Sequence, residues 1–359
     1  MIDVYRNSLL TISAMSAKDS HEGFLHRRTS PERFRCEVPF SSSERQISVK
    51  AIVSWPPSNP GRDVLNTRGW ALQELILPSR VLHFSAEQMI WDCRAQQRED
   101  NLSPLITGNF GARIRAWLQS NDALRDSPYK RWYALVENYT SRAITVPTDK
   151  LPAIAGLALE IQMSVKRDEY LAGLWKQDFV AGLMWTPSEN KPLRKPQTPY
   201  RAPSWSWASY DGHISYDAVL HDRGQEFSLE ILDVVVHHSG SNALGMLKPG
   251  CHVQANGVVR GVKVRAKNVF GLYDFEDRRG EFLPDDGSDA RGKEIWCVDM
   301  LAQGYVGDST TQIFPHGLAL QREESDGEHF RRVGTFKLGA GTDRQIWFAG
   351  IERRVLTIY

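Results

Sequence analysis

The polar residues best placed to do chemistry lie in one short stretch, residues 65–84, which reads LNTRGWALQELILPSRVLHF. Glu74 follows Trp70 by four positions, so their side chains share one face of a helix. A carboxylate that is partly buried beside an aromatic ring can have a raised pKa and act as a general acid or base. Glu74 is therefore the candidate catalytic residue. The motif residues that we single out are Arg68, Gly69, Trp70, Gln73, Glu74 and Arg80.

The same stretch also has a purely structural interpretation. Arg68, Gln73 and Glu74 can satisfy backbone groups at a helix end, while Trp70 and Leu72 fill the core. We favour this interpretation, so we assign no catalytic residue and expect an interaction module rather than an enzyme.

No residue pattern predicts a metal or a cofactor. A zinc site needs three or four converging ligands, and the chain has neither an H-x-x-x-H nor a C-x-x-C pair. The segment DAVLHD, with Asp217, His221 and Asp222, is better explained by surface or hydrogen-bonded side chains. The same holds for the histidines in or beside predicted strands, which are His213, His237, His238 and His252. Cys93 has no neighbouring base and is expected to be a small buried hydrophobic residue.

Other chemical signatures are also lacking. The phosphate-binding G-x-x-x-x-G-K-[ST] loop, a strand-anchored G-x-G-x-x-G and the G-x-S-x-G serine elbow do not occur. The segment SWSWASYDG, read as a strand, places Trp205 and Trp207 on one face. That face could form a sugar-binding platform, but an inner face packed in the core explains it better.

Composition excludes several classes of protein. The 359 residues are 41% hydrophobic and 24% charged, which is ordinary for a soluble globular chain. A net charge of +1 gives no general attraction to nucleic acid, and no apolar run is long enough for a membrane span. Four cysteines far apart and no signal-like start indicate a reduced, intracellular protein, cytoplasmic or nuclear, and we expect the cytoplasm.

We expect an α+β fold in four parts. Residues 1–99 begin with a strand at 9–14, apolar enough to be buried on both faces and central in a sheet. Residues 18–48 are expected to be irregular, and 48–55 to form a strand. A short helix over 68–77, ended by Pro78, precedes a hairpin of RVLHF and QMIWDC.

The remaining three parts differ in character. Residues 100–186 show apolar residues at spacings of three and four, which predicts about four helices at 110–120, 127–142, 147–165 and 169–185. Residues 187–203 form a Pro-rich loop. Residues 204–359 alternate in strand fashion, up to RQIWFAG near the end, and predict an antiparallel sheet or small sandwich with an exposed acidic loop at 285–291.

The motif resembles the hallmark of the fungal heterokaryon-incompatibility (HET) domain family, R-G-W-T-L-Q-E followed by P-R-V-L-H-F. Here it reads RGWALQE at 68–74 and SRVLHF at 79–84. The departures are Ala71 for Thr, Leu75 where a basic residue is common, and the order Pro78-Ser79. QMIWDC, the segment DVYRNSLLTISAMSAKDSHEGF and several later segments, among them YRAPSWSWASYDG and RRVGTFKLG, are also similar to HET proteins, so the resemblance extends over nearly the whole chain.

The motifs of the family's N-terminal half, an S-Y-C-W-G-like strand and a W-I-D-x-x-C-I-x-Q-like segment, do not occur. Residues 1–99 therefore resemble the C-terminal portion of a HET domain. We expect either a truncated or inactive copy, or a gene product whose start lies upstream of Met1.

The resemblance implies a role in fungal nonself recognition and the programmed cell death that follows fusion of incompatible hyphae, through protein partners. Two alternatives remain open. One is a NAD-cleaving effector resembling Toll/interleukin-receptor domains, for which Glu74→Ala and NAD loss are the tests. The other is an accessory role in a secondary-metabolite gene cluster, for which neighbouring genes are the test. Oligomeric state is left open.

Overall fold

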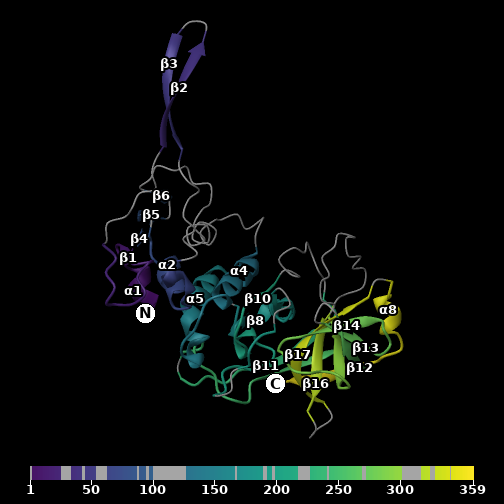
Figure 1. The fold of residues 1–359 in the computed structure, drawn as a ribbon. Helices are drawn as coiled ribbons and strands as arrows, with labels where there is room; N and C mark the ends of the chain where they lie inside the picture. The colour runs from purple at the N-terminus through teal and green to yellow at the C-terminus, as the bar shows by residue number, and fades with distance from the viewer. Residues whose placement is uncertain are drawn as a thin grey trace. The chain divides into compact units, whose positions relative to one another are not determined.

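The computed structural model describes residues 2–25, 34–42, 45–53, 63–86, 89–93, 97–99, 127–165, 168–188, 192–195, 199–216, 227–240, 242–268, 272–300, 317–323, 328–339 and 341–359, with only the backbone described for 34–42, 45–53 and 97–99. The chain divides into two compact units, Met1–Asn121 (unit 1) and Asp122–Tyr359 (unit 2). Helices occur together with mainly antiparallel strands, and the C-terminal region is β-rich, so the predicted α+β class is confirmed (Figure 1).

Unit 1 contains a four-stranded sheet with the order β1-β4-β5-β6. Its elements are α1 (Ile2–Arg6), β1 (Thr11–Ser13), the 3-10 helix η2 (Val64–Thr67), α2 (Ala71–Ile76), β4 (Arg80–Phe84), β5 (Met89–Cys93) and β6 (Gln97–Glu99). The predicted helix before Pro78 is confirmed as α2, and the predicted hairpin as the antiparallel pair β4 and β5. Val81 and Ile90 are fully buried in this sheet.

The expected central strand at 9–14 is wrong in its placement. β1 pairs in parallel with β4 and ends the described strand order, and Ile12 remains 58% exposed. An apolar run predicts burial on both faces, but Leu9, Leu10 and Ile12 are exposed. In the structure, Ser13 is the buried residue of the strand instead.

The expectation of irregular structure over 18–48 is wrong in part. β2 (Phe34–Ser42) and β3 (Arg45–Val53) form an antiparallel pair from Phe34↔Val53 to Ser42↔Arg45. The first strand carries Phe34, Cys36, Val38 and Phe40 at alternate positions. This is the period of a strand, which the polar and Arg-rich surroundings concealed.

The helical part of unit 2 is built on α4 (Pro128–Thr140) and α5 (Ala155–Ser164). The hydroxyl of Ser127 accepts a hydrogen bond from the backbone N–H of Tyr129 at 3.3 Å and so caps α4. The predicted apolar face is confirmed, since Trp132, Leu135, Val136 and Tyr139 are all buried. Short 3-10 helices η3 (Pro147–Asp149) and η4 (Pro152–Ile154) precede α5, with Pro152 in the first turn as expected. The predicted helix at 110–120 lies outside the described residues.

The predicted helix over 169–185 is wrong in its first half. Residues there form a tight hairpin of β7 (Tyr170–Leu171) and β8 (Leu174–Trp175), followed by η5 (Lys176–Asp178) and a short α6 (Phe179–Gly182). The backbone turns through Ala172 (φ 51°) and Gly173 (φ 101°). The indole N–H groups of Trp132 and Trp207 both donate to the carbonyl of Gly173, at 2.8 and 3.0 Å, and fix this turn.

The SWSWASYDG segment is not a strand. Trp207–Ser209 form the 3-10 helix η7, and the hydroxyl of Ser206 accepts from the N–H of Ala208 and donates to the carbonyl of Ala172. Trp205 and Trp207 are both fully buried, which favours the core interpretation over a sugar-binding platform. β9 (Thr186–Pro187) and β10 (Ile214–Ser215) pair beside this segment.

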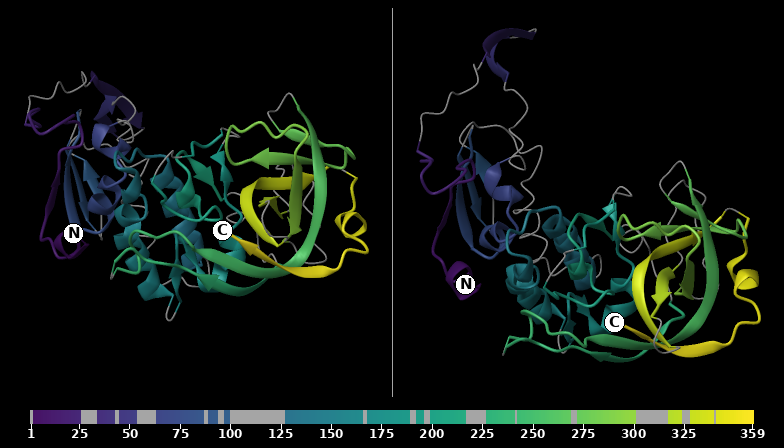
Figure 2. Two further views of the ribbon diagram at one scale, coloured as in Figure 1. Left: turned by 90° about the horizontal axis from the view of Figure 1, so that it is seen from below. Right: turned by 60° about the horizontal axis from the view of Figure 1, so that its bottom comes forward.

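The β-rich part of unit 2 closes into a barrel rather than a sandwich (Figure 2). Going round, β12 pairs with β13, then come β14, β17, β16 and β15, and β15 pairs back onto β12. The strands are β11 (Glu230–Val235), β12 (His252–Lys267), β13 (Tyr273–Phe275), β14 (Gly280–Pro284), β15 (Glu294–Asp299), β16 (Gly317–Arg322), β17 (His329–Leu338) and β18 (Arg353–Ile358). The 16-residue β12 reaches past the ring, where β11 and β18 pair with its first half.

The barrel interior is apolar and is closed at one end by α8 (Arg344–Trp347). The predicted strand at RQIWFAG is therefore wrong, because Asp343 Oδ1 accepts from the N–H groups of Gln345 and Ile346 and starts a helix. The ring of Trp347 stacks on Phe275 with centroids 6.0 Å apart, and the guanidinium carbon of Arg260 lies 4.8 Å from the centroid of the Trp347 ring.

A buried ion pair joins the barrel to the helical part within unit 2. Arg332 on β17 and Asp285 are both fully buried, and Arg332 Nε lies 2.8 Å from Asp285 Oδ2. Arg332 also donates to the carbonyls of Leu183 and Trp185, with its guanidinium carbon 3.3 Å from the Trp185 ring centroid. The expected exposed loop at 285–291 is thus wrong for Asp285, although residues 287–289 are exposed.

Candidate functional site

The motif of residues 68–80 forms a corner of unit 1. Trp70 is the N-cap residue of α2, and Ala71, Leu72, Gln73, Leu75 and Ile76 are buried along that helix. Gly69 is buried as well, and its carbonyl accepts from the N–H of Leu72 at 3.1 Å. The stretch therefore contributes mainly apolar side chains to the core, and Trp70 itself is half-buried.

The charged motif residues lie toward solvent. Arg68 and Arg80 are exposed and Glu74 is half-buried, and no ion pair joins Arg68 to Glu74. The Arg80 guanidinium donates to the carbonyl of Leu9 at 3.4 Å, a long contact between β4 and the residues before β1. The motif thus does not bring its charged groups together as a reactive set.

Glu74 has one neighbour that the sequence did not reveal. The pKa of Tyr5 on α1 is raised, first by burial and then by the negative charge of Glu74 and a hydrogen bond with it. A carboxylate that accepts from a tyrosine hydroxyl is held in place by that bond. This contact links α1 to α2 and fits a structural role for Glu74.

Three residues of the types used by serine hydrolases lie on neighbouring strands of the same sheet. Ser13 on β1 is in register with His83 on β4, and His83 Nε2 lies 3.5 Å from Asp92 Oδ2 on β5. All three side chains are buried, with exposed fractions of 4%, 1% and 0%. Ser13 Oγ has no hydrogen-bond partner within the described structure, so it is not coupled to the histidine as a nucleophile must be.

Sequence reasoning missed this group because its members are spread over 80 residues. The signal was present in the alternation of Val81 with His83 and of Ile90 with Asp92, which puts all four side chains on one face of a strand pair. The burial of these side chains favours a structural role over a catalytic one. A substrate cannot reach these atoms without opening the sheet.

The described residues contain neither a metal-binding cluster nor a helix that could cross a membrane. Within the described residues, no group of three or more His, Cys, Asp or Glu side chains is arranged to hold a metal ion. Asp217, His221 and Asp222 lie outside the described residues. Cys93 is half-buried rather than fully buried as expected. Over the described parts of the chain, no helix is long and apolar enough to cross a bilayer.

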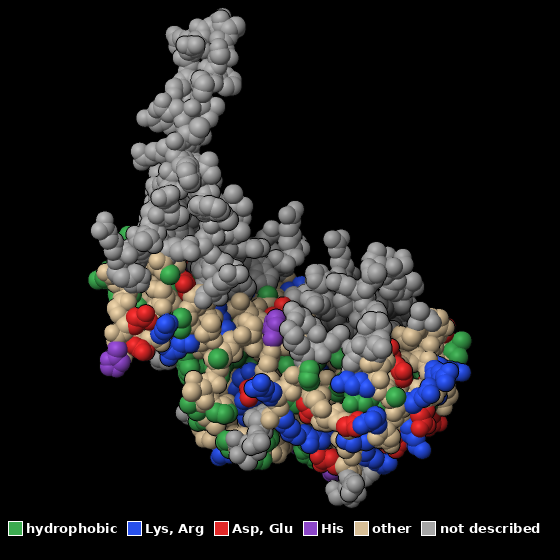
Figure 3. Space-filling view, in the orientation of Figure 1, with side chains coloured by type: hydrophobic (Ala, Val, Ile, Leu, Met, Phe, Trp, Pro, Cys, Tyr) green, Lys and Arg blue, Asp and Glu red, His purple; other side chains and the backbone are tan. Residues whose placement is uncertain are grey.

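The most unusual feature of the surface of unit 1 is a set of exposed hydrophobic side chains. Five large hydrophobic side chains of residues 4–25 are exposed, namely Val4 at 70%, Leu9 at 81%, Leu10 at 41%, Ile12 at 58% and Leu25 at 77%. Hydrophobic side chains are visible at the surface of this unit (Figure 3). Leu9, Leu10 and Ile12 belong to β1 or its immediate approach, and we call these three residues the β1 apolar edge.

The β1 apolar edge coincides with an open strand edge. β1 pairs with β4 in the register Thr11↔Val81, Ile12↔Leu82 and Ser13↔His83, and within the described residues no strand lies along its other side. An exposed, apolar strand edge offers backbone N–H and C=O groups for pairing with another segment. Chemically, this site can bind an extended peptide segment.

Comparison of the chain with protein-family models, with curated proteins and with solved structures finds no match.

Proposed function

We propose that this chain acts as an interaction and signalling module of the HET type in the cytoplasm of a filamentous fungus. Its role would be in nonself recognition and the cell death that follows. The resemblance of RGWALQE and SRVLHF to the HET hallmark supports the family. The observation that carries the mode of action is the β1 apolar edge, because large exposed apolar patches mark interaction sites.

The partner that this edge fits is a protein that adds an extended segment beside β1. Main-chain hydrogen bonds would supply affinity, and apolar side chains at alternate positions of the segment would pack on Leu10 and Ile12. A binding role is favoured over catalysis because the charged motif residues are dispersed and the Ser13, His83 and Asp92 group is buried.

Controlled expression in a filamentous fungus tests the proposal, with cell death and cellular NAD measured together. Wild-type chain is expected to kill cells without loss of NAD. Ile12→Lys should abolish killing, because a lysine breaks the apolar edge and opposes strand addition. Met163→Lys is the matched control, since Met163 is 46% exposed in unit 2 and should leave killing intact.

Glu74→Ala separates the proposal from the NAD-cleaving alternative. The interaction module keeps its killing activity in this variant, whereas an enzyme that relies on Glu74 loses both killing and NAD consumption. Absence of killing by the wild-type chain, or equal killing by wild type and Ile12→Lys, would overturn the proposal.

A further inference from the structure

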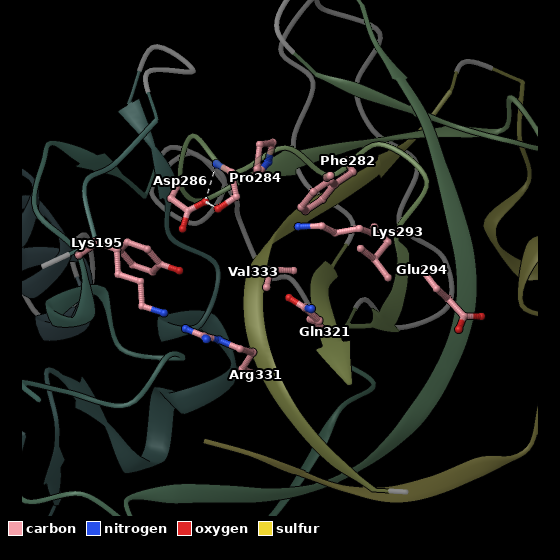
Figure 4. Close-up of a pocket in the computed structure, with 13 residues that line it drawn as sticks. Lys195, Phe282, Pro284, Asp286, Lys293, Glu294, Gln321, Arg331 and Val333 are labelled. Carbon is pink, nitrogen blue, oxygen red and sulfur yellow. Dashed lines mark hydrogen bonds between the residues drawn. The ribbon is translucent and has the colours of Figure 1, made fainter. Parts of the chain in front are cut away.

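The barrel of unit 2 has a pocket at the end opposite α8. Its cavity volume is about 180 Å³, and its walls come from β14, β15, β16, β17 and the loop at 286–290, with Lys195 and Tyr210 from the segments before the barrel (Figure 4). The pairing of β16 with β17 shows at which end of the barrel this pocket lies. Gln321 pairs with Arg331 at one end of β16 and β17, whereas Gly317 pairs with Phe336, close to the Trp347 ring, at the other.

Side chains that point into the barrel change character at this end. Ile295, Ala319 and Val333 belong to or pack on the apolar interior. Lys293, just before β15, and Gln321 on β16 lie two positions beyond Ile295 and Ala319, and Arg331 on β17 pairs with Gln321; all three line the pocket. Because side chains alternate along a strand, Lys293 and Gln321 continue the inward rows, and the register shift between Ala319 and Leu320 brings Arg331 opposite Gln321. A barrel whose inward rows turn from apolar to cationic at the open end has a polar mouth.

Three cations line this mouth, which we define as Lys195, Lys293 and Arg331; the two lysines are exposed and Arg331 is half-buried. Figure 4 shows the nitrogens of Lys195 and Arg331 facing one another, with the Lys293 amine also directed into the pocket. The pKa of Lys195 is lowered, first by burial and then by the charge of Arg331, against an opposing effect of Asp286. No salt bridge joins any of the three to a described carboxylate.

The two acidic residues in the lining offset only part of the positive charge of the mouth. Asp286 Oδ1 accepts from the N–H of Ser288 at 2.9 Å and from its hydroxyl, so this carboxylate already has partners. The carboxylate of Glu294 points away from the Lys293 amine (Figure 4). The facing donors of Lys195 and Arg331 suit an oxyanion.

A second pocket of about 390 Å³ adjoins the first and shares Lys195, Tyr210 and Arg331 with it. Its walls add flat and apolar surfaces from Tyr200, Tyr359, Pro199 and Pro203. Aromatic and proline surfaces favour a planar ring. The two pockets together therefore offer a cationic end and an aromatic end separated by shared residues.

We propose that the barrel mouth binds a small molecule in which a phosphate or carboxylate group is attached to a planar ring. The oxyanion lies between Lys195 and Arg331, which line both pockets, and the ring lies against Tyr200 in the adjoining pocket. This site belongs to unit 2 and is independent of the β1 apolar edge.

Calorimetric titration of the full chain with four probes tests this site. The probes are phenyl phosphate, benzoate, inorganic phosphate and phenol. Phenyl phosphate or benzoate should bind more tightly than either inorganic phosphate or phenol, and the tighter of the two identifies the oxyanion. Arg331→Gln and Lys195→Gln should each weaken that probe about 10-fold or more, because each removes a charge-assisted hydrogen bond.

Matched controls separate a built site from general charge. Arg265→Gln and Lys263→Gln remove exposed cations from β12 of the same barrel and should leave affinity unchanged. Tyr200→Ala should weaken phenyl phosphate or benzoate and leave inorganic phosphate unaltered. The proposal is overturned if no ring-bearing oxyanion binds saturably, if the mouth variants bind as wild type does, or if the controls lose affinity to the same extent.

Discussion

The two units depart from the rule of apolar inside and polar outside in opposite directions. Unit 1 exposes Leu9, Leu10 and Ile12 beside an open strand edge, while unit 2 closes its strands into a barrel and buries Arg332 and Asp285. An open edge leaves apolar surface and backbone groups for a partner, whereas a closed barrel leaves few edges and must satisfy its buried charges internally. We therefore propose that the departure in unit 1 serves binding, and expect the one in unit 2 to serve stability.

Arg332→Leu is expected to have the largest effect on stability. The substitution leaves Asp285 as a buried carboxylate without its counter-charge and removes the donors to the Leu183 and Trp185 carbonyls. Breaking a buried pair in this way costs about 3 to 5 kcal/mol in the free energy of unfolding. Urea unfolding followed by tryptophan fluorescence measures it.

The double variant Asp285→Leu/Arg332→Leu should recover part of that loss, since both charges are then gone. Arg265→Leu, at an exposed position on β12, serves as the control. An Arg332→Leu chain as stable as wild type would show that the buried pair is not what joins the barrel to the helical part.

The buried carboxyl of Asp178 should make the stability of unit 2 depend on pH. Burial, with a smaller contribution from the charge of Asp168, raises its pKa from 3.8 to about 6, against the opposing effects of the Tyr133 hydroxyl and Lys130. The folded chain therefore binds more protons than the unfolded chain between about pH 4 and 6. The stabilisation of the folded chain by the protonated Asp178 carboxyl is fully present below about pH 4. It is lost as the pH rises through about 6.

Asp178→Asn removes this titration. As the pH rises from 4 to 7, the unfolding free energy of the variant should increase relative to that of wild type by roughly 2 to 3 kcal/mol. This follows from about 1.4 kcal/mol for each unit by which the pKa is raised. Unfolding curves at a series of pH values measure the difference, with Asp233→Asn at an exposed position as the baseline. Parallel pH profiles for wild type and Asp178→Asn would contradict it.

Trp70→Ala should cost less than a core tryptophan would. Replacing a fully buried tryptophan with alanine costs ~3 to 5 kcal/mol in unfolding free energy. Trp347 is fully buried at the barrel end, so we expect a loss of this size for Trp347→Ala. Because Trp70 is half-buried at the N-terminus of α2, we expect roughly 1 to 2 kcal/mol there. Thermal unfolding of both variants would test the order, and a larger loss for Trp70→Ala would make the motif the main core of the chain.

Local patterns predicted the elements whose side chains alternate or repeat cleanly. The face of α4 with Trp132 and Tyr139, the hairpin of β4 and β5, and most strands of unit 2 were predicted from the spacing of apolar residues. For the motif, Leu72 is buried as the structural interpretation expects, whereas Trp70, also expected in the core, is only half-buried. In each case the signal lies within about ten residues of sequence.

Features set by distant contacts could not be predicted in this way. The turn at Gly173 depends on indoles from Trp132 and Trp207, and barrel closure depends on the pairing of β12 with β15. The mouth cations lie on three segments spread over the sequence from Lys195 to Arg331, and Arg332 differs from its neighbour Arg331 only in the direction in which the strand presents it. Charge and spacing alone do not reveal which arginine is buried.

Ile12→Lys should have the smallest effect on stability and is the most direct test of the comparison. Ile12 is 58% exposed, so its replacement removes little buried area, and surface substitutions usually change the unfolding free energy by no more than ~0.5 kcal/mol. Urea unfolding measures the unfolding free energies of Ile12→Lys and of Met163→Lys, each of which replaces an exposed hydrophobic residue. If Ile12→Lys unfolds like wild type yet loses cell killing, the exposed isoleucine contributes to binding and not to folding. A loss above ~2 kcal/mol would instead mean that β1 packs its apolar side chains within the unit, and the two units would then follow the same rule.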